Sequence, residues 1–361
     1  MHVVVIGAGI IGVTTAYSLR RQGFEVTVVE RNGGVAQEAS HANGGVIAPG
    51  YTGPWSGPGA GRRLLRALFG ADPALRLRLG RDPALWRWLQ RFLDEATIEH
   101  HRRAKQRMFR LAAYSQSQLH VLQARHAIEF ERQPGLLHLF RTEEALACHA
   151  PQRALLAELG VALHVLDAAG CRALEPSLNA HTALAGGVHL PTDETGNCAF
   201  FARRLKEIAE ADGVRFAFNT TATALDIGGG RVNAIVTPQG PMHADACVLA
   251  GGADGATLLS GSGIDLPLLP VRGASATVPI VRHDLAPLIA VMDDRYKVVV
   301  TRMGKRLRIA GTAVIGARDT RVDARAAAVL LKVASDWYPG TASYSKAQWW
   351  AGLRPMLPDG P

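Results

Sequence analysis

The chain has 361 residues, and its 40 Lys and Arg residues outnumber its 31 Asp and Glu residues, for a formal net charge of +9. Hydrophobic residues make up 48% of the chain and charged residues 20%, a balance typical of globular proteins that excludes a disordered or fibrous chain. The length suggests two domains, each large enough to bury a core. The basic charge is compatible with nucleic acid, an anionic membrane surface or acidic ligands, and does not choose among them.

The four cysteines, Cys148, Cys171, Cys198 and Cys247, form no CxxC pair and have no His at metal-ligand spacing. They indicate buried thiols rather than a disulfide framework or a metal site. The first expected strand begins at His2, which leaves no room for a signal peptide, and no apolar run is long enough to span a bilayer. We therefore expect a cytoplasmic protein whose only membrane contact would be peripheral, at the inner membrane.

The amino-terminal segment contains the strongest pattern in the sequence. His2–Ile6 predicts a buried strand and runs into Gly7-Ala8-Gly9-Ile10-Ile11-Gly12. A helix is expected from about Ile11 to Arg21, followed by a second strand over Glu25–Val29 that is closed by Glu30. This order is typical of a dinucleotide-binding βαβ unit.

Each glycine of this turn has a mechanical role in that interpretation. Gly7 permits the tight turn, Gly9 lets the backbone approach a pyrophosphate, and Gly12 lets the helix lie close to the strand. The start of the helix offers N–H groups and a partial positive charge to the anion. Glu30 follows Gly12 by 18 residues, which suits a carboxylate that holds the ribose hydroxyls and argues against NADP. This unit alone leaves FAD and NAD open.

Small residues and paired glycines follow the second strand, in Ala39-Ser40-His41-Ala42-Asn43-Gly44-Gly45. Such a loop suits either contact with a flat ligand or a flexible surface. Together with the opening unit and Pro49-Gly50-Tyr51, it resembles the small subunit of bacterial D-amino acid dehydrogenase, in the D-amino acid oxidase and glycine oxidase superfamily. The similarity continues along the chain in the family's order, through Arg132–Gly135, Leu139–Glu143, Leu190–Gly196, Tyr296–Arg302 and Gly352–Met356.

The resemblance implies FAD as the cofactor and an α/β fold, with a Rossmann-type FAD-binding domain and a discontinuous α+β substrate domain built on an antiparallel sheet. The expected FAD-binding domain comprises residues 1–60, 145–262 and 346–361, and the expected substrate domain residues 61–144 and 263–345. The residues expected to bind the cofactor are Val3, Ile6, Gly7, Gly9, Ile10, Ile11, Gly12, Glu30, Arg31, Ser40, Asn43, Gly44, Ala222 and Gly251.

The segment from Arg62 to Arg132 is rich in arginine and predicts helix, with an apolar stripe of Leu85, Leu89, Phe92 and Leu93. A basic amphipathic helix either packs on the protein core or lies on anionic lipid. Packing is the favoured interpretation because most such helices pack, and Trp86 and Trp88 add only slight support for lipid. No part of the pattern matches a nucleic-acid-binding module.

The second half of the chain predicts one more helix and two sets of strands. The helix is expected over Cys198–Asp212, and the strands over Val214–Phe218, Ala222–Ile227, Arg231–Val236, Ala244–Ala250, Val278–Ile280, Lys297–Thr301 and Arg306–Gly311. In the family, backbone groups around Ala222 contact the adenine, and the Gly251-Gly252 turn approaches the ribityl and pyrophosphate side. The last three strands correspond to the sheet that covers the flavin ring and the substrate.

The reaction that the resemblance implies is oxidation of a D-amino acid, such as D-alanine, to the imino acid, which water hydrolyses to a 2-oxo acid and ammonia. The electrons pass to a quinone or another respiratory acceptor. The substrate carboxylate requires a planar, bidentate cation, and Arg354 matches the family's carboxylate-binding arginine. Tyr296, expected to open the strand that presents a tyrosine to the carboxylate, is the second candidate and Tyr51 the third; an ordinary packing role stays open for both.

The family continues beyond Met356–Pro361 with a strand, a Gly-rich turn and a helix that closes over the flavin. The resemblance therefore implies that this chain lacks part of the flavin pocket and binds flavin more weakly. Two alternatives stay open: an oxidase of the same fold that acts on glycine or sarcosine with O₂, and a flavin-binding remnant without activity.

Overall fold

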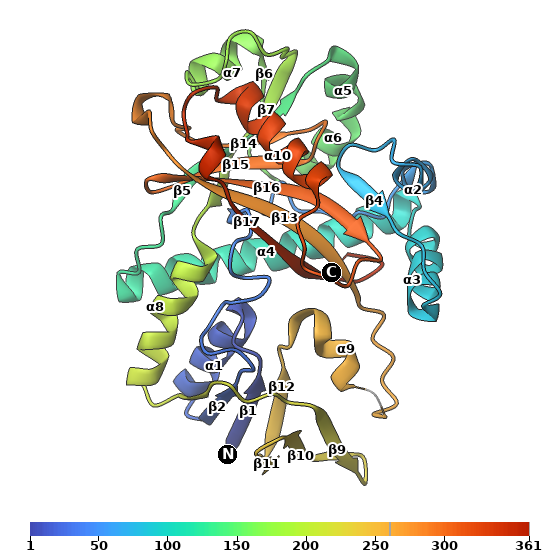
Figure 1. Ribbon diagram of the computed structural model, residues 1–361, viewed down its shortest axis with the longest axis vertical. Coiled ribbons are helices and arrows are strands. Elements are labelled where there is room, and N and C mark those ends of the chain that lie inside the picture. The colour runs from blue at the N-terminus through green and yellow to red at the C-terminus, as the bar shows by residue number, and fades with distance from the viewer. Residues whose placement is uncertain (260, 361) are drawn as a thin grey trace. The chain divides into compact units, whose positions relative to one another are not determined.

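The computed structural model describes residues 1–259 and 261–360, and the chain divides into two compact units (Figure 1). Unit 1 comprises residues 1–41, 198–270 and 353–356, and unit 2 comprises residues 42–197, 271–352 and those described after 356. Residues 42–60 and 145–197, predicted for the FAD-binding domain, therefore belong to unit 2. The cause is long-range pairing, because β7 (Gly186–Thr195) pairs with β5 (Gln133–Phe140) and with β3 (Val46–Ile47).

Unit 1 is built on a parallel sheet in the order β12-β1-β2-β8. The central strand β1 (His2–Ile6) pairs with β2 (Glu25–Val29) and β12 (Ala246–Leu249), and β8 (Arg215–Ala217) pairs with β2. Successive residues of β1 are buried, as expected for a parallel strand covered on both faces. The first two strands have the predicted bounds.

Helix α1 (Ile10–Arg21) connects β1 to β2, and α8 (Cys198–Ala211) packs beside it. Ala16 of α1 and Leu205 of α8 are fully buried, whereas Leu19 and Ile208 are only half-buried. An antiparallel meander adds β9 (Ala224–Gly228), β10 (Arg231–Thr237) and β11 (Gly240–Met242), the last of which was not predicted. After β12 come the short helices η1 (Gly252–Asp254) and α9 (Gly255–Leu258).

Most of unit 2 is organised on a large sheet in the order β17-β13-β16-β15-β14-β5-β7-β3. Its strand pairs are mainly antiparallel, as predicted, although β14–β5 and β4–β16 are parallel. The remaining strands are β4 (Leu75–Leu77), β6 (His164–Asp167), β13 (Leu269–Pro279), β14 (Ala290–Asp293), β15 (Val298–Met303), β16 (Arg306–Ile315) and β17 (Gln348–Met356).

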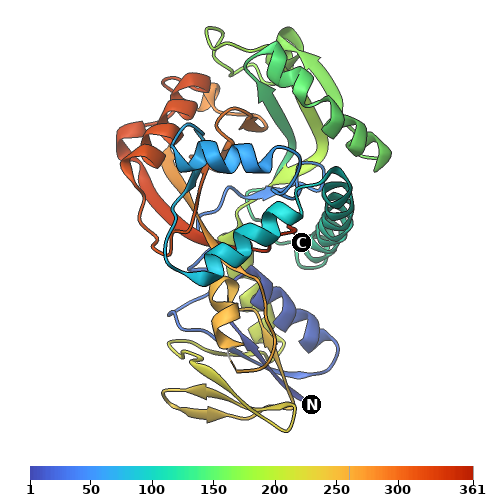
Figure 2. The same cartoon turned by 90° about the vertical axis from the view of Figure 1, so that its right-hand side faces the viewer.

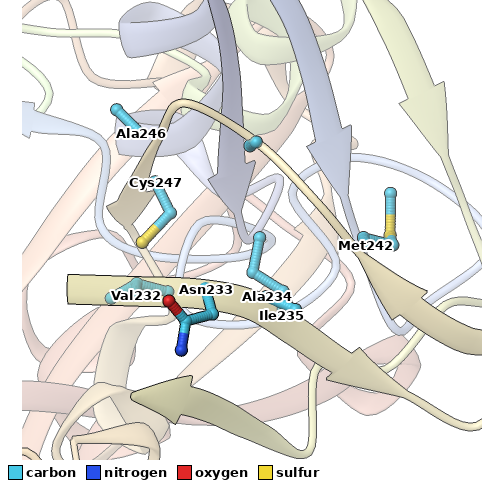
Figure 3. Close-up of a pocket in the computed structure, with 8 residues that line it drawn as sticks. Val232, Asn233, Ala234, Ile235, Met242, Ala246 and Cys247 are labelled. Atoms are coloured by element: carbon cyan, nitrogen blue, oxygen red, sulfur yellow. The ribbon is translucent and has the colours of Figure 1, made fainter. Parts of the chain in front are cut away.

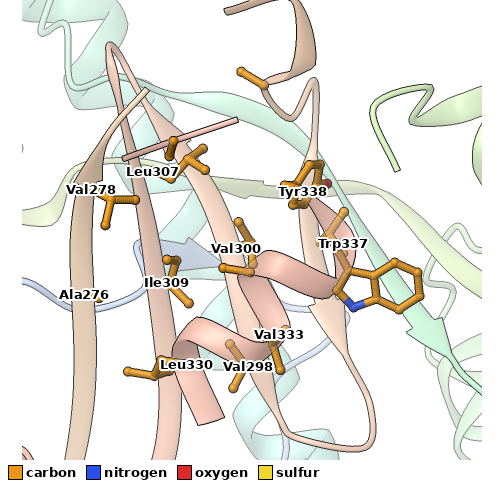
Figure 4. Close-up of a cluster of buried hydrophobic side chains, with 14 of the residues drawn as sticks. Ala276, Val278, Val298, Val300, Leu307, Ile309, Leu330, Val333, Trp337 and Tyr338 are labelled. Atoms are coloured by element: carbon orange, nitrogen blue, oxygen red, sulfur yellow. The ribbon is translucent and has the colours of Figure 1, made fainter. Parts of the chain in front are cut away.

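The two faces of this sheet bury different apolar clusters. Val298 and Val300 of β15 contact the cluster that contains Leu330 and Val333 of helix α10 (Ala324–Trp337) (Figure 4). Val299, which lies between them, belongs to the other cluster. This alternation is that of a strand buried on both sides. We refer to the two sides as the α10 face and the opposite face.

The arginine-rich region is not one continuous helical stretch. It contains α2 (Ala60–Leu68), the short strand β4, α3 (Pro83–Asp94) and α4 (Ile98–His126), and in Figure 2 α2 (blue) and α3 (cyan) lie toward the viewer. The breaks have local causes: Asp82 accepts the Ala84 N–H as the N-cap of α3 with Pro83 at the first helical position, and Thr97 caps α4.

The apolar stripe of α3 faces the protein interior. Leu85, Leu89 and Phe92 are buried, as is Trp88, so the packing interpretation of this helix is confirmed for these residues. Leu93 does not belong to the buried stripe, because its side chain is exposed. The other helices of unit 2 are α5 (Glu143–Cys148), α6 (Ala150–Glu158), α7 (Ala168–Leu174), η2 (His283–Leu285) and η3 (Tyr344–Lys346).

Candidate functional site

The glycine turn of unit 1 has the geometry of a phosphate-binding turn. A Cβ on Gly12 would overlap the carbonyl oxygen of Gly7 and lie 2.9 Å from its carbonyl carbon, so this glycine lets α1 lie against the end of β1. Gly7 has a φ of 104°, and a Cβ there would lie 2.6 Å from the carbonyl oxygen of Ala250. At Gly9 the nearest atom to a Cβ would be Ser40 Oγ at 3.4 Å, which leaves this backbone approachable by a ligand.

The start of α1 is suited to an anion. The N-cap Gly9 supplies no side-chain hydrogen bond, and the first turn contains no acidic residue. Ile10 N–H donates to Ser40 Oγ at 3.0 Å, so the predicted cofactor residue Ser40 lies at this helix end, while Ile11 is exposed. These features fit the diphosphate of a dinucleotide.

Glu30 lies at the carboxyl end of β2 beside the turn. Its Oε2 accepts the Ala8 N–H at 2.7 Å, and its Oε1 accepts the N–H and the side-chain amide of Asn32, both at 2.9 Å. Glu30 is 8% exposed, and these three hydrogen bonds hold its carboxylate in one orientation next to the glycine turn. This placement suits a ribose-binding acid.

The other predicted cofactor residues of unit 1 surround these two elements. Arg31 forms ion pairs with Glu38 and Asp254, and Asp254 follows Gly251 in the loop after β12. Gly251 lies beside Gly7, because a Cβ on Gly7 would be 3.3 Å from its Cα. Ala222 packs with Val4 and Ile6 in the apolar cluster of this unit, and Val3 is buried in β1.

A second set of contacts fixes the segment of residues 42–52, which we call the loop segment, on the sheet of unit 2. Ser275 Oγ donates to the Ala42 carbonyl at 2.6 Å and Arg308 Nη1 to the Asn43 carbonyl at 2.8 Å. A Cβ on Gly44 would lie 2.8 Å from Val299 Cγ1, which places Asn43 and Gly44 on the opposite face of the sheet.

The end of the loop segment is held by two buried charged residues. Asp193 accepts the Gly50 and Tyr51 N–H groups, each at 2.9 Å, and Lys105 Nζ donates to the carbonyls of Gly50 and Thr52. The sequence analysis did not identify Ser275, Arg308, Asp193 or Lys105 as functional. Asp193 had a usable signal, since it lies within the resemblance segment Leu190–Gly196, whereas Lys105 is hidden among the arginines of α4.

The two candidate tyrosines lie on different faces of the unit 2 sheet. Tyr51 packs with the cluster of the opposite face, and its ring contacts His138 edge-on at 5.5 Å. Tyr296 packs against the α10-face cluster, and Arg141 Cζ lies 5.2 Å from its ring centre. Tyr296 does not open β15: it lies in the turn before that strand, which begins at Val298.

Arg354 lies near the end of β17 and is half-buried. β17 is the neighbour of β13 in the sheet order. Of the residues that the structure describes, none forms a group of three or more His, Cys, Asp or Glu side chains able to hold a metal ion. Within the same residues, no helix combines the length and apolar character of a membrane-spanning segment.

Arg141 belongs to a buried ion-pair network rather than to a solvent-facing site. Its guanidinium contacts Asp293 at 2.7 Å and Asp336 at 2.8 Å, and Trp337 Nε1 donates to Asp293 at 2.8 Å. The pKa of Arg141 is affected most by burial, which lowers it, but the two carboxylates outweigh burial and raise it. This network ties β5 and β14 to α10.

One small hollow in unit 1 lacks the charged side chains found at the glycine turn and around Arg141 (Figure 3). None of its lining residues is charged, and burial raises the pKa of the Cys247 thiol, which keeps it protonated. The lining residues are Val232, Asn233, Ala234, Ile235, Met242, Ala244, Ala246 and Cys247.

Comparison with known proteins agrees with this geometry. The family model described as "DAO: FAD dependent oxidoreductase" matches residues 2–361. D-amino acid dehydrogenases from Rhodopseudomonas palustris and Rhizorhabdus wittichii are 42% and 43% identical to the chain, which aligns over all of its own length and over 85% and 87% of theirs. The glycine oxidase structure from Geobacillus kaustophilus is 22% identical, with a TM-score of 0.72 over 99% of this chain and 84% of that one.

The family match confirms FAD as the cofactor, and the solved structures confirm the fold class. The residues at the start of α1 and at the end of β2 fit the diphosphate and ribose of this cofactor. The chain therefore belongs to the family of FAD-dependent oxidoreductases that includes the D-amino acid dehydrogenases.

Proposed function

We propose that the protein oxidises D-amino acids such as D-alanine to 2-oxo acids and ammonia, and passes the electrons to a respiratory acceptor such as a quinone. The observation that supports this most strongly is the full-length similarity to D-amino acid dehydrogenases at more than 40% identity. The intact glycine turn and the fixed carboxylate of Glu30 support binding of the cofactor, and the alternative of a flavin-binding remnant without activity is separated from an enzyme by the flavin reduction measured below.

Bound FAD supplies the acceptor for the hydride that leaves the substrate α-carbon. The start of α1 and Glu30 hold the dinucleotide and so fix where that acceptor lies. The Arg354 guanidinium binds the substrate carboxylate with two parallel hydrogen bonds, which orient the α-carbon. When the substrate amine binds unprotonated, no side chain of the protein has to take up a proton during hydride transfer.

The two tyrosines support Arg354 unequally in this proposal. Tyr51 follows directly after the loop segment's glycines, on the same face of the sheet as Gly44. Tyr296 packs beside Arg141 on the α10 face, which favours a structural role for its ring. We therefore place Tyr51 before Tyr296 as the second substrate contact.

The test is an anaerobic absorbance titration of FAD-loaded protein with a panel of D- and L-amino acids. We expect D-alanine to bleach the flavin band. Arg354→Ala should retain FAD but lower the rate of bleaching about 100-fold, because charge-assisted hydrogen bonds contribute about 1.5–3 kcal/mol. Arg204→Ala, which removes an exposed arginine of α8, is the matched control and should behave like the parent protein. Normal bleaching of Arg354→Ala would contradict the assignment of this residue.

The glycine oxidase neighbours make an oxidase the second candidate function. The two functions differ in how reduced flavin is reoxidised. A dehydrogenase should react slowly with O₂ and rapidly with a soluble quinone, whereas an oxidase should react rapidly with O₂. Stopped-flow mixing of the reduced protein with each acceptor separates the two.

A quinone acceptor would bring the protein to a membrane surface, and α2 carries the residues for such a contact. Leu65 and Phe69 are 57% and 77% exposed, and Arg62 and Arg66 occupy the same side of the helix at i, i+3 and i+4 spacing. Exposed apolar side chains among arginines favour an anionic lipid surface. Leu65→Asp/Phe69→Asp should abolish sedimentation with phosphatidylglycerol vesicles, whereas Val281→Asp, a similarly exposed control, should not. Equal sedimentation of both variants would refute this contact.

A further inference from the structure

The turn at the end of the loop segment is held at both ends by opposite charges. The Asp193 carboxylate accepts N–H groups of Gly50 and Tyr51, at 2.9 Å each. Lys105 Nζ donates to the carbonyl of Gly50 at 2.7 Å and to that of Thr52. Thr52 N–H donates to the Ala48 carbonyl, so the turn resembles one turn of helix with an anion at its amino end and a cation at its carboxyl end.

The backbone fits closely around these two side chains. A Cβ on Gly50 would lie 3.0 Å from Asp193 Oδ2, and one on Gly53 would lie 3.4 Å from Lys105 Cδ. Glycine at these positions therefore lets the turn approach both charged residues. Asp193 comes from β7, the strand that also pairs with β3 through Glu194 and Thr195, so β7 fixes both the strand and the turn of the loop segment.

Both charges are removed from water, which argues against a role in overall stability. Lys105 is 0% exposed and Asp193 1% exposed. Burial is the largest influence on each, and it raises the pKa of Asp193 to about 6 and lowers the pKa of Lys105 to about 8. Folding therefore favours the neutral form of each group: the contribution of Asp193 to stability falls as the pH rises toward 6, and that of Lys105 falls as the pH drops toward 8.

We propose that Lys105 and Asp193 are positioning residues that fix the loop segment, and through it Tyr51, for substrate oxidation. This inference rests on the proposed function, because it assigns the turn to the same site. Burial of both side chains carries a desolvation cost, and their hydrogen bonds fix a backbone turn that has no sheet or helix of its own. Both are charged together only between about pH 6 and pH 8, so the turn keeps this form in that interval.

The other charged groups near the turn are already paired or lie at its margin. Glu194, the next residue of β7, raises the pKa of Asp193 by charge repulsion, but its own carboxylate is paired with Arg132 and His120. His138 contacts the Tyr51 ring, and burial lowers the pKa of His138 so that it stays neutral. His101 interacts with the Ser56 carbonyl at 2.7 Å, beyond the turn.

The test compares Asp193→Asn and Lys105→Met with Glu175→Gln. Glu175 is a matched control in the same unit, because it is 0% exposed and accepts the N–H groups of Leu288 and Ile289 at 2.7 and 3.0 Å. Two quantities are measured: hydrogen exchange of the peptide that contains Gly50 and Tyr51, and the rate of anaerobic flavin reduction by D-alanine from pH 5 to pH 9.

We expect Asp193→Asn and Lys105→Met to lose protection from hydrogen exchange at Gly50 and Tyr51. Both variants should also reduce flavin at least tenfold more slowly at pH 7. Asp193→Asn should remove the fall in rate near pH 6, and Lys105→Met the fall near pH 8, whereas Lys105→Arg should restore part of the rate. Glu175→Gln should keep the rate and both pH limits even where its melting temperature falls. Unchanged protection from hydrogen exchange in Asp193→Asn would overturn the conclusion that the two charges fix the turn. Lost protection with an unchanged rate of flavin reduction would overturn the positioning role.

The exchange measurement keeps this inference separate from the proposed function. If no D-amino acid reduces the flavin of the parent protein, the proposed function fails, while the exchange data still decide whether the two charges fix the turn.

Discussion

In the glycine turn of unit 1, alanine substitutions of Gly12 and Gly9 should impair two different properties, stability and FAD binding. In Gly12→Ala the new methyl group would overlap the Gly7 carbonyl oxygen, and the overlapped atom is backbone, so no side-chain movement can relieve the clash. Overpacking of this kind costs about 1–3 kcal/mol, which outweighs the gain of about 1 kcal/mol that alanine brings inside a helix. In Gly9→Ala the methyl group meets only Ser40 Oγ at 3.4 Å, and the backbone φ of −66° suits any residue.

The expected results therefore separate stability from binding. Gly12→Ala should lower the melting temperature of the cofactor-free protein, by about 2–4 °C for each kcal/mol lost in a chain of this size. Gly9→Ala should leave that temperature unchanged and weaken FAD at least tenfold, because its methyl group occupies the space through which the diphosphate approaches. Differential scanning fluorimetry without FAD and a titration that follows flavin fluorescence measure the two quantities.

Either of two results would refute the reasoning. A Gly12→Ala protein as stable as the parent would mean that α1 does not lie as close to β1 as the structure shows. Normal FAD affinity in Gly9→Ala would mean that the diphosphate does not approach the backbone at this position. Ser40→Ala serves as a control for the hydroxyl beside Gly9, since it removes the Ile10 N–H contact without adding volume.

Three further predictions concern buried or half-buried titratable side chains. Glu30→Gln should weaken FAD about tenfold without loss of apo stability above ~1 kcal/mol, because the amide can still accept the Ala8 N–H; titration calorimetry with FAD would contradict this if the affinity were unchanged. Asp293→Asn should lower the free energy of unfolding, measured by urea denaturation, by about 3–5 kcal/mol, because Arg141 then keeps only its ion pair with Asp336. A loss below ~1 kcal/mol would show that the network is dispensable for stability. Burial lowers the pKa of His149 to about 3, so its contribution to stability is complete above the ordinary histidine pKa of about 6.5 and falls as the pH drops toward 3. His149→Phe should therefore remove about 1–2 kcal/mol of the stability loss between pH 6.5 and pH 5. An unchanged loss of stability over this pH range would exclude His149 as its source.

Local pattern was enough to predict the elements of unit 1. The strand pair β1–β2, the turn between them and helix α8 are each determined by neighbouring residues, by alternating burial, glycine spacing and the 3.6-residue period. The missed strand β11 is short and contains Pro241, which makes it a poor strand by composition.

Unit 2 was predicted less well because its sheet joins residues far apart in the chain. β5 pairs with β14, more than 140 residues later, and in parallel. No local signal assigns such a partner. Residues 145–197, expected in the FAD-binding domain, lie in unit 2 because β7 pairs with β5 and β3. The helix breaks before α3 and α4 depended on Asp82 and Thr97 as N-caps, two ordinary polar residues within an arginine-rich region.

The candidate site shows the same division between local and distant information. The loop segment has only two residues of strand, Val46 and Ile47, so most of its backbone N–H and carbonyl groups cannot be satisfied by a sheet or helix of their own. Unit 2 satisfies several of them with buried polar side chains, Ser275, Arg308, Asp193 and Lys105, which stand where the pattern of a strand or helix predicts apolar or solvated residues. A polar residue at such a position looks like an irregularity when only its sequence neighbours are considered. Its role is visible only once the distant segment that it hydrogen-bonds is known. The buried polar side chains that donate to or accept from this irregular segment therefore show which part of the backbone unit 2 holds in a fixed shape.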